Sequence, residues 1–397
     1  MNIETVANYR SQVEELRNTV YSNKSANKKG DVALRGIMSA SLFNLMPTID
    51  VEQHEDVMDK ISFFQRWAVK DQKHIELIEQ LVFEGPQPDF GAFHTAPTIF
   101  CSYHVGSYRL LIPYLIRQGL SITMLIDSAV ALQQSDDFRA VVNCADPEAI
   151  AEGRFEILDT AKSNLMIAMM RTLRRGRCLI VFIDGNSSVN GNEADPGNMV
   201  PLQFLGQTMY ARKGVAFLSH LTGASVTPVM LYRAGDGYWE NRMRWHSPIH
   251  PGDQERGSYV RSTIVKLYHI LEESMPPVFE QWESWRYVEK SLAVCNAGTV
   301  KTIPSSTQAI PIDASLQLNK RRYAKYQLDE EQYLLFDRSS YRSLFITADF
   351  SAFLDGFVSP QTVECSLAHP SMTPGALKSM LSKEILIFSD TCEEMPT

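Results

Sequence analysis

Three short apolar runs of the chain each end in an ionisable side chain: His104, Asp127 and Asp184. The runs cover residues 98–103, 122–126 and 179–183. An imidazole with a pKa of about 6.5 can accept a proton near neutral pH, which makes His104 a candidate general base. If the runs are parallel strands, the three side chains lie at the same edge of one sheet, where open α/β folds bind their ligands.

The surrounding sequence predicts the elements that carry these residues. From about residue 97, short β-rich apolar runs alternate with helical patterns, and a fourth run covers residues 226–232. This alternation predicts an α/β fold with a central, mainly parallel or mixed sheet flanked by helices. Before the break at Gly85 and Pro86, helical spacings of apolar residues and few turn signals predict a helical N-terminal region.

Four segments follow from these patterns. The predicted boundaries are 1–90 for the N-terminal helical region, 91–295 for the α/β domain, 296–317 for a linker and 318–397 for a small C-terminal module. The linker is rich in Ser, Thr, Pro and Ala and nearly free of charge. In the last segment a hairpin pattern precedes short helical segments and a final short strand, which predicts a winged-helix-like module.

The composition excludes several classes of protein. The chain has 397 residues, 44% of them hydrophobic and 21% charged, with a formal net charge of -8. These values exclude a disordered or fibrous protein, and the acidic balance argues against a general nucleic-acid coat. The apolar runs are shorter than the about 20 residues that cross a bilayer, so no integral membrane association is expected. The six scattered cysteines form no CxxC pair, which predicts no metal site and a cytoplasmic location.

Two groups of basic residues contrast with the net negative charge. The first precedes the Asp184 run and comprises Arg171, Arg174, Arg175 and Arg177. Its simpler interpretation is a solvated helix end. The second, Arg212 and Lys213, enters the next predicted helix beside the expected site. Cations at a helix N-terminus could bind the phosphate of coenzyme A, of a carrier-bound pantetheine or of an aminoacylated RNA.

An ordered set of sequence blocks resembles the late lipid A (lauroyl/myristoyl) acyltransferases of the lysophospholipid acyltransferase superfamily. The blocks lie within roughly residues 95–290 and are the strand that ends at His104, LRRGRCLIVFIDGN, VPLQFLG, ARKGVAFLSHLTGASVTPVMLYR and PPVFEQWESWRY. The resemblance implies an acyltransferase fold in which His104 deprotonates a hydroxyl or amine as it attacks an acyl thioester. Backbone amides near Gly106 or in the turn at Gly206, or a nearby cation, would stabilise the oxyanion.

Carried onto this chain, the resemblance implies a catalytic set and a donor-binding set. The catalytic set is His104, Asp127 and Asp184. The donor-binding set is Ser107, Arg109, Gly206, Arg212 and Lys213. The acyl donor would be acyl-coenzyme A or an acyl-carrier protein, with no further cofactor and no metal.

The chain departs from the family at two positions. Five residues after His104 the family has an acid that orients the imidazole, whereas this chain has Arg109, which has no acceptor atom. After the next strand the family tends to have a basic residue, whereas this chain has Asp127. One hypothesis is a charge-swapped pair of Arg109 and Asp127, with Asp127 or Asp184 orienting the imidazole. The other is an altered or inactive enzyme.

The C-terminal module loosely resembles the winged-helix domains that bind precursor peptides in ribosomal-peptide natural-product pathways. It could hold a peptide or an acyl-carrier protein, and its basic start, residues 320–325, could contact an acidic carrier or RNA. The whole chain is therefore interpreted as a soluble acyltransferase with a small-molecule acceptor, such as a natural-product intermediate. The reason is that the membrane anchor typical of the lipid A enzymes is not seen in the sequence. The alternatives are a catalytically silent protein that binds a peptide or carrier, and an enzyme fed by aminoacyl-tRNA.

Overall fold

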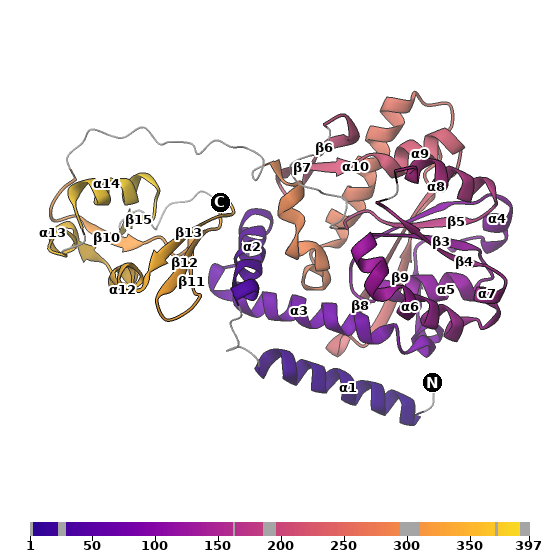
Figure 1. Cartoon of the computed structure of the whole chain (residues 1–397), viewed down its shortest axis with the longest axis horizontal. Helices are drawn as coiled ribbons and strands as arrows, with labels where there is room; N and C mark the ends of the chain where they lie inside the picture. Colours follow the sequence, from indigo (N-terminus) through magenta and orange to yellow (C-terminus); the bar gives the residue numbers. More distant parts are fainter. Residues whose placement is uncertain are drawn as a thin grey trace. The chain divides into compact units, whose positions relative to one another are not determined.

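The structure, a computed structural model, describes residues 3–22, 29–161, 163–185, 196–293, 310–369 and 372–389 (Figure 1). The chain divides into two compact units. The larger unit comprises residues 1–24 and 56–293, and the smaller unit comprises residues 25–55 and 294–397. Each unit is therefore discontinuous in sequence. Within the described part of the chain, no helix is long and apolar enough to cross a membrane.

The larger unit is built on a seven-stranded sheet with the strand order β1-β9-β8-β2-β5-β3-β4 (Figure 1). Its strands are β1 (Val82–Glu84), β2 (Ile99–Ser102), β3 (Ile122–Ile126), β4 (Phe155–Asp159), β5 (Cys178–Phe182), β8 (Val226–Ala234) and β9 (Glu240–Trp245). All neighbouring strands are parallel except β8 and β9. The prediction of an α/β fold with a mainly parallel central sheet is confirmed.

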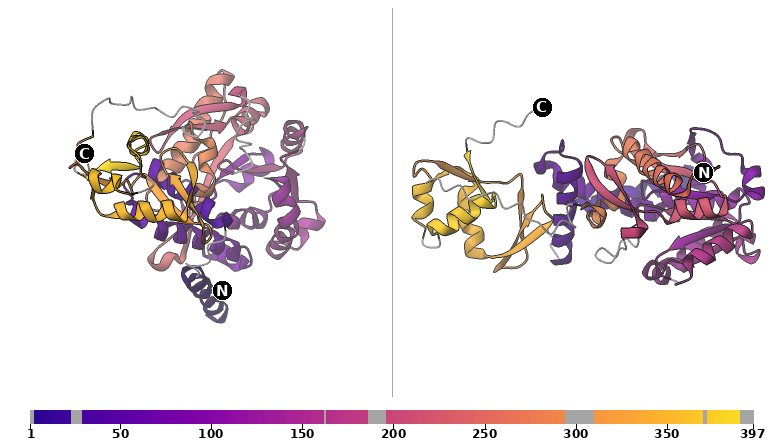
Figure 2. Two further views of the ribbon diagram at one scale, coloured as in Figure 1. Left: turned by 60° about the vertical axis from the view of Figure 1, so that its left-hand side comes forward. Right: turned by 90° about the horizontal axis from the view of Figure 1, so that it is seen from above.

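Helices cover both faces of this sheet (Figures 1 and 2). They are α1 (Ile3–Ser22), α3 (His54–Asp71), α4 (Phe90–Thr95), α5 (Leu111–Arg117), α6 (Ser128–Ala145), α7 (Glu148–Ala151), α8 (Leu165–Arg174), α9 (Gly214–Thr222) and α10 (Arg256–Ser274). A hairpin of β6 (Met199–Phe204) and β7 (Gln207–Arg212) packs against α10. Because helices cover both faces, the central strands are apolar throughout, and all four residues of β2 are buried.

A buried polar cluster fixes α1 and α3 to the sheet. The Tyr9 hydroxyl of α1 donates to Asp71 at the end of α3 (2.6 Å) and accepts from the Trp67 indole (2.7 Å). Asp71 also pairs with Arg233 of β8, and both of these side chains are almost completely buried. Because buried charges are tolerated when they pair and hydrogen-bond, this cluster gives the two helices a defined place beside β8.

The smaller unit joins one N-terminal helix to the C-terminal part of the chain. Its elements are α2 (Lys29–Leu45), β10 (Ser315–Leu318), β11 (Tyr323–Gln327), β12 (Gln332–Asp337), β13 (Arg342–Thr347), α12 (Ala348–Asp355), β14 (Gln361–Thr362), α13 (Val363–Leu367), α14 (Pro374–Ser382) and β15 (Leu386–Phe388). Strands β11, β12 and β13 form one antiparallel sheet, and β14, β10 and β15 form a second. Strands, helices and a last short strand follow one another as the sequence indicates. The assignment as a winged helix stays a prediction.

Helix α2 packs on the sheet of β11, β12 and β13 through an apolar cluster that includes Val32 and Phe336. Gly36 permits this contact, because a Cβ atom there would lie 2.6 Å from the Phe336 ring. Residues 1–90, expected as one region, are thus distributed over both units, since an apolar helix face does not reveal which sheet will cover it. Of the predicted linker, residues 296–309 lie outside the described part, and β10 begins before the linker's predicted end.

Candidate active site

The strand order brings two of the predicted site residues together. Strands β2 and β5 are parallel neighbours, and their last residues, Ser102 and Phe182, are paired in register. His104 and Asp184 each follow two residues later, so both lie at the carboxyl edge of the sheet. Local strand signals in the sequence were sufficient to predict this edge.

His104 and Asp184 form a hydrogen-bonded dyad. The Nδ1 atom of His104 lies 2.8 Å from Oδ1 of Asp184, and the backbone N–H of His104 donates to Oδ2 at 3.0 Å. Because an ionised carboxylate only accepts, the ring proton is on Nδ1 and the lone pair is on Nε2. Nε2 has no hydrogen-bond partner among the described residues, and the side chain is 19% exposed. The imidazole is therefore partly accessible, and its Nε2 is not engaged by the described residues.

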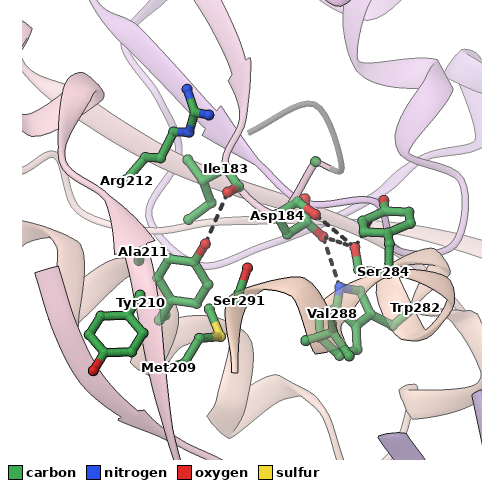
Figure 3. Close-up of a pocket in the computed structure, with 13 residues that line it drawn as sticks. Ile183, Asp184, Met209, Tyr210, Ala211, Arg212, Trp282, Ser284, Val288 and Ser291 are labelled. Atoms are coloured by element: carbon green, nitrogen blue, oxygen red, sulfur yellow. Dashed lines mark hydrogen bonds between the residues drawn. The ribbon is translucent and has the colours of Figure 1, made fainter. Parts of the chain in front are cut away.

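Two further donors hold the Asp184 carboxylate. The Trp282 indole N–H donates to Oδ2 at 2.8 Å, and the Ser284 hydroxyl donates to the same oxygen at 3.1 Å. Both side chains point toward Asp184 (Figure 3). The backbone carbonyl of Asp184 lies 3.0 Å from the same hydroxyl oxygen, so the single proton of Ser284 is shared between the main chain and the side chain of Asp184. The carboxylate, only 2% exposed, is thus oriented before any ligand binds.

The electrostatics of the dyad favour an ionised aspartate beside a basic imidazole. Burial by itself raises the pKa of Asp184, but the His104 charge and the hydrogen bonds from His104 and Trp282 outweigh it, so the pKa is lowered. Burial by itself lowers the pKa of His104, but the charge and hydrogen bond of Asp184 outweigh it, so the pKa is raised. His104 is therefore a stronger base than a free histidine, and Asp184 stays ionised near neutral pH.

Sequence analysis missed the segment that supplies the two extra donors. Trp282 and Ser284 lie in and beside the 3₁₀ turns η7 (Phe279–Gln281) and η8 (Glu283–Arg286). The same segment closes over the histidine loop, because the Glu283 N–H donates to the His104 carbonyl at 2.9 Å. The only signal for this role was the block PPVFEQWESWRY, whose contacts cannot be read from its letters.

Gly106 allows the histidine loop to pass close to β8. Its φ is +54°, and a Cβ atom would lie 2.7 Å from the Tyr232 Cα and 2.6 Å from the Gln281 Oε1. Only glycine fits a position that combines a positive φ with such contacts. The Gly106 N–H donates to the Gln281 carbonyl at 3.1 Å. This amide, one of the expected oxyanion donors, is therefore already engaged.

The hydrogen bonds of Arg109 go to two amide side chains. Arg109 donates to Gln72, the residue after α3 (2.9 Å), and to Gln134 of α6 (3.1 Å). Asp127 does follow β3 at the same edge of the sheet, but β5 lies between β3 and β2. Asp184 is therefore the carboxylate that contacts His104. The Oγ of Ser107, another predicted donor-binding atom, is buried without a partner among the described residues.

A small cavity adjoins the dyad. Its free volume is ≈ 20 Å³, and Asp184, Trp282 and Ser284 line it together with Arg212 of β7 (Figure 3). Burial lowers the pKa of Arg212, whose guanidinium nevertheless stays charged near neutral pH. Of the predicted donor-binding residues, Arg212 is the one that shares a cavity with the dyad.

The remaining predicted residues lie elsewhere. Lys213 precedes α9 as its N-cap residue and donates to the Gly197 carbonyl. Gly206 closes the tip of the hairpin with a φ of +75°, whereas Arg212 pairs with Met199 at the opposite end.

Arg177 is not part of a solvated helix end, unlike the basic residues before it. Its guanidinium is buried and donates to Thr123 Oγ1 (3.0 Å) and to the carbonyls of Gly153 (2.6 Å) and Ile122 (2.7 Å). It therefore fastens the start of β5 to β3. Among the described residues, no cluster of three or more His, Cys, Asp or Glu side chains could hold a metal ion.

Comparison with known proteins adds little to this geometry. The chain matches no protein-family model and no curated protein. Among solved structures, it is similar to the 1-acyl-sn-glycerophosphate (LPA) acyltransferase PlsC from Thermotoga maritima, with 14% sequence identity and a TM-score of 0.33. The match covers 67% of this chain and 97% of that chain. This likeness is too distant to carry an argument about activity. The fold and site together define an α/β protein with a histidine–aspartate dyad at the carboxyl edge of its sheet.

Proposed function

We propose that the larger unit is an acyltransferase that moves an acyl group from a thioester to a hydroxyl or amine. The observation that carries the proposal is the dyad, in which Asp184 holds the Nδ1 proton of His104 and Nε2 is not engaged by the described residues. A general base needs this tautomer and this orientation. The sequence blocks that resemble lipid A acyltransferases supply the reaction class.

The proposed reaction needs one proton transfer in each direction. Nε2 of His104 removes the proton from the acceptor hydroxyl or amine while its oxygen or nitrogen attacks the thioester carbonyl. The tetrahedral intermediate then expels the thiolate, and the His104 imidazolium returns the proton to sulfur. Asp184 stabilises the imidazolium between these steps, as its effect on the pKa of His104 indicates. Arg212, one of the residues that line the cavity beside Asp184, is proposed as the cation that stabilises the oxyanion.

Asp184 is proposed to take over the orienting role that the acid five residues after the histidine has in the resembled family. It makes two hydrogen bonds to His104 and is itself held by Trp282 and Ser284. A small-molecule acceptor and a coenzyme A or carrier-protein donor complete the proposal. Both of these rest on the sequence.

A mass-spectrometric screen tests the proposal. Purified protein is incubated with acyl-coenzyme A, acyl-carrier protein and aminoacyl-tRNA donors, each with a pool of small amines and alcohols. We expect an acylated product from one thioester class, lost in His104→Ala and kept in His269→Ala. The control residue is 61% exposed on α10 and far along the chain from the dyad. Product formation by His104→Ala at the wild-type rate would remove His104 from the mechanism.

One observation favours a second candidate, a protein that binds a peptide through its smaller unit. Strand β13 is an edge strand whose outer side pairs with no other described strand, and its Leu344 and Phe345 are 53% and 69% exposed. Edge strands usually carry charges or prolines that prevent pairing with another chain. Peptides selected from a random library should bind the wild type and not a variant with Leu344→Lys and Phe345→Lys. Such binding without any transfer product would favour the silent binding protein.

A further inference from the structure

A second, larger cavity of ≈ 420 Å³ lies on the larger unit between β6, the start of α9 and the first turns of α10. We call it the basic groove, because Lys213, Arg256 and Arg261 line it. Its volume falls within the range of small-molecule sites, about 300 to 1,000 Å³. None of these residues contacts the dyad, so the basic groove is separate from the site described above.

The basic groove contrasts with the formal net charge of -8 of the whole chain. Neither Arg256 nor Arg261 has an ion-pair or hydrogen-bond partner within the described residues, and both are exposed. The single carboxylate among its lining residues, Glu255, accepts the Ser258 N–H at 2.8 Å as the N-cap of α10. Three cations against one carboxylate give the basic groove a positive potential that favours an anion.

The walls of the basic groove are apolar. Pro201 and Met199 come from β6, Phe217 from α9 and Val260 from α10. The guanidinium of Arg256 lies over the Phe217 ring at 5.4 Å, which holds the cation toward the ring while its N–H groups have no partner in the described part of the chain. A free inorganic anion would use the cations but not the walls. The occupant that fits both is an organic phosphate, with a charged head and a body that can contact apolar side chains.

The basic groove also adjoins the candidate active site along the chain. Arg212 lines the cavity of Asp184, and the next residue, Lys213, lines the basic groove. Met199, on the basic groove's wall, pairs with Arg212 across the hairpin. The basic groove and the cavity of Asp184 are therefore lined by consecutive residues, Arg212 and Lys213, which suits a donor whose phosphate and thioester are at opposite ends of one molecule.

We infer that the basic groove binds the phosphate of a phosphorylated pantetheine, with Arg256 and Arg261 as its phosphate ligands and Lys213 on the side of the active site. This inference rests on the proposed function, because it assigns the phosphate-bearing end of the thioester donor. It names two residues beyond those that the sequence indicated. Coenzyme A and the 4′-phosphopantetheine arm of a carrier share this chemistry, so the test must separate them.

The test is a binding titration by isothermal calorimetry of the full-length protein with coenzyme A, 4′-phosphopantetheine and pantetheine. We expect the two phosphorylated probes to bind, pantetheine to bind at least about tenfold more weakly, and the affinity for coenzyme A to fall with salt. In the double variant Arg256→Gln and Arg261→Gln, the Kd for coenzyme A should rise about tenfold or more, since charge-assisted hydrogen bonds are lost. Arg174→Gln with Arg175→Gln removes the same charge at the exposed end of α8 and should change nothing.

The arms of the titration have distinct meanings. If coenzyme A and 4′-phosphopantetheine bind with similar affinities, the basic groove binds the phosphate next to pantetheine. If coenzyme A binds much more tightly, the basic groove binds the phosphates of its nucleotide part. Equal binding of pantetheine and coenzyme A, or an unchanged Kd in the double variant, overturns the inference. Binding does not require turnover, so wild-type binding without any transfer product leaves the basic groove standing while the proposed function fails. If the double variant transfers the acyl group with an unchanged KM for coenzyme A donors, the proposed function is kept and the inference about the basic groove fails.

Discussion

Asp184→Asn is the substitution that tests the dyad most directly, because it changes the charge of the residue while keeping its shape. In the wild type, Oδ2 accepts from Trp282 and Ser284, and Oδ1 accepts from Nδ1 of His104. An asparagine keeps an oxygen for Trp282 and Ser284 only by turning its NH₂ group toward Nδ1. Nδ1 must then accept, so the ring proton moves to Nε2. The atom that should act as a base becomes a donor.

The expected magnitudes follow from these bonds. Neutral hydrogen bonds contribute about 0.5 to 1.5 kcal/mol and charge-assisted ones about 1.5 to 3 kcal/mol. Changing the three side-chain bonds of residue 184 from charge-assisted to neutral should therefore lower the free energy of unfolding by about 3 to 4.5 kcal/mol. Part of this loss of stability is offset, because the substitution also removes the cost of burying the Asp184 charge. A general base contributes about 10²- to 10⁴-fold to a rate, and transfer should fall by that factor. The protein should therefore stay folded and lose its activity.

Two measurements check this substitution. Nitrogen-15 NMR of the histidines distinguishes the two tautomers, and His104 is assigned by its absence in His104→Ala. In Asp184→Asn the pKa of His104 should fall, because burial remains while the aspartate charge is gone. Because its pKa is raised in the folded protein, His104 stabilises the wild type at pH values below the pKa of an unfolded histidine. This stabilisation is lost as pH rises through the pKa of His104 in the folded protein. That part of the pH dependence should vanish in the variant.

Asp127→Asn is the matched control, since it removes one charge from the end of a neighbouring strand at the same sheet edge. We expect it to leave the His104 tautomer, the pKa and the transfer rate unchanged. An Asp184→Asn variant that keeps the proton on Nδ1 and the wild-type pKa would refute the reasoning. An Asp127→Asn variant with the larger effect would move the orienting role to Asp127.

Three further substitutions have defined outcomes. Trp282→Phe removes one donor from the carboxylate, which becomes a stronger acceptor, so the pKa of His104 should rise further in an NMR titration. Gly106→Ala should cost about 1 to 3 kcal/mol in chemical denaturation, because its Cβ would meet the Tyr232 backbone. Burial lowers the pKa of His54 to about 4. As pH falls below about 6.5, the unfolded chain binds a proton at His54 before the folded protein does. The free energy of unfolding of the smaller unit should therefore decrease by roughly 3 kcal/mol by pH 4. Hydrogen exchange of residues 29–55 and 310–369 should show this loss in the wild type and not in His54→Gln.

The sequence predicted the sheet edge correctly because strand ends are local features. His104 and Asp184 each follow a short apolar run, and parallel strands present their carboxyl ends at one edge. It could not choose between Asp127 and Asp184, because both have the same local pattern. The choice depends on β5 lying between β2 and β3, and strand order is decided by how crossover helices pack, which no local pattern contains.

Hydrogen-bond partners that are distant in sequence could not be predicted either, because local sequence patterns do not contain tertiary packing. Trp282 and Ser284 reach Asp184 across about a hundred residues, and the letters of their block do not reveal which carboxylate they will contact. Arg177 looked like the last member of an exposed basic cluster. Its backbone and hydroxyl acceptors belong to other strands and turns, so its burial appears only when the sheet is assembled.

The position of Arg109 bears on whether the chain could be catalytically silent. In the sequence, an arginine where the resembled family has an acid was the main reason to consider inactivity. In the structure, Arg109 binds Gln72 and Gln134 and so joins the loop after β2 to the residue that follows α3 and to α6. The imidazole requires only one carboxylate at Nδ1, and Asp184 occupies that place with its own main chain and side chain fixed by Ser284. Because the dyad is complete without residue 109, the arginine alone is no argument against catalysis.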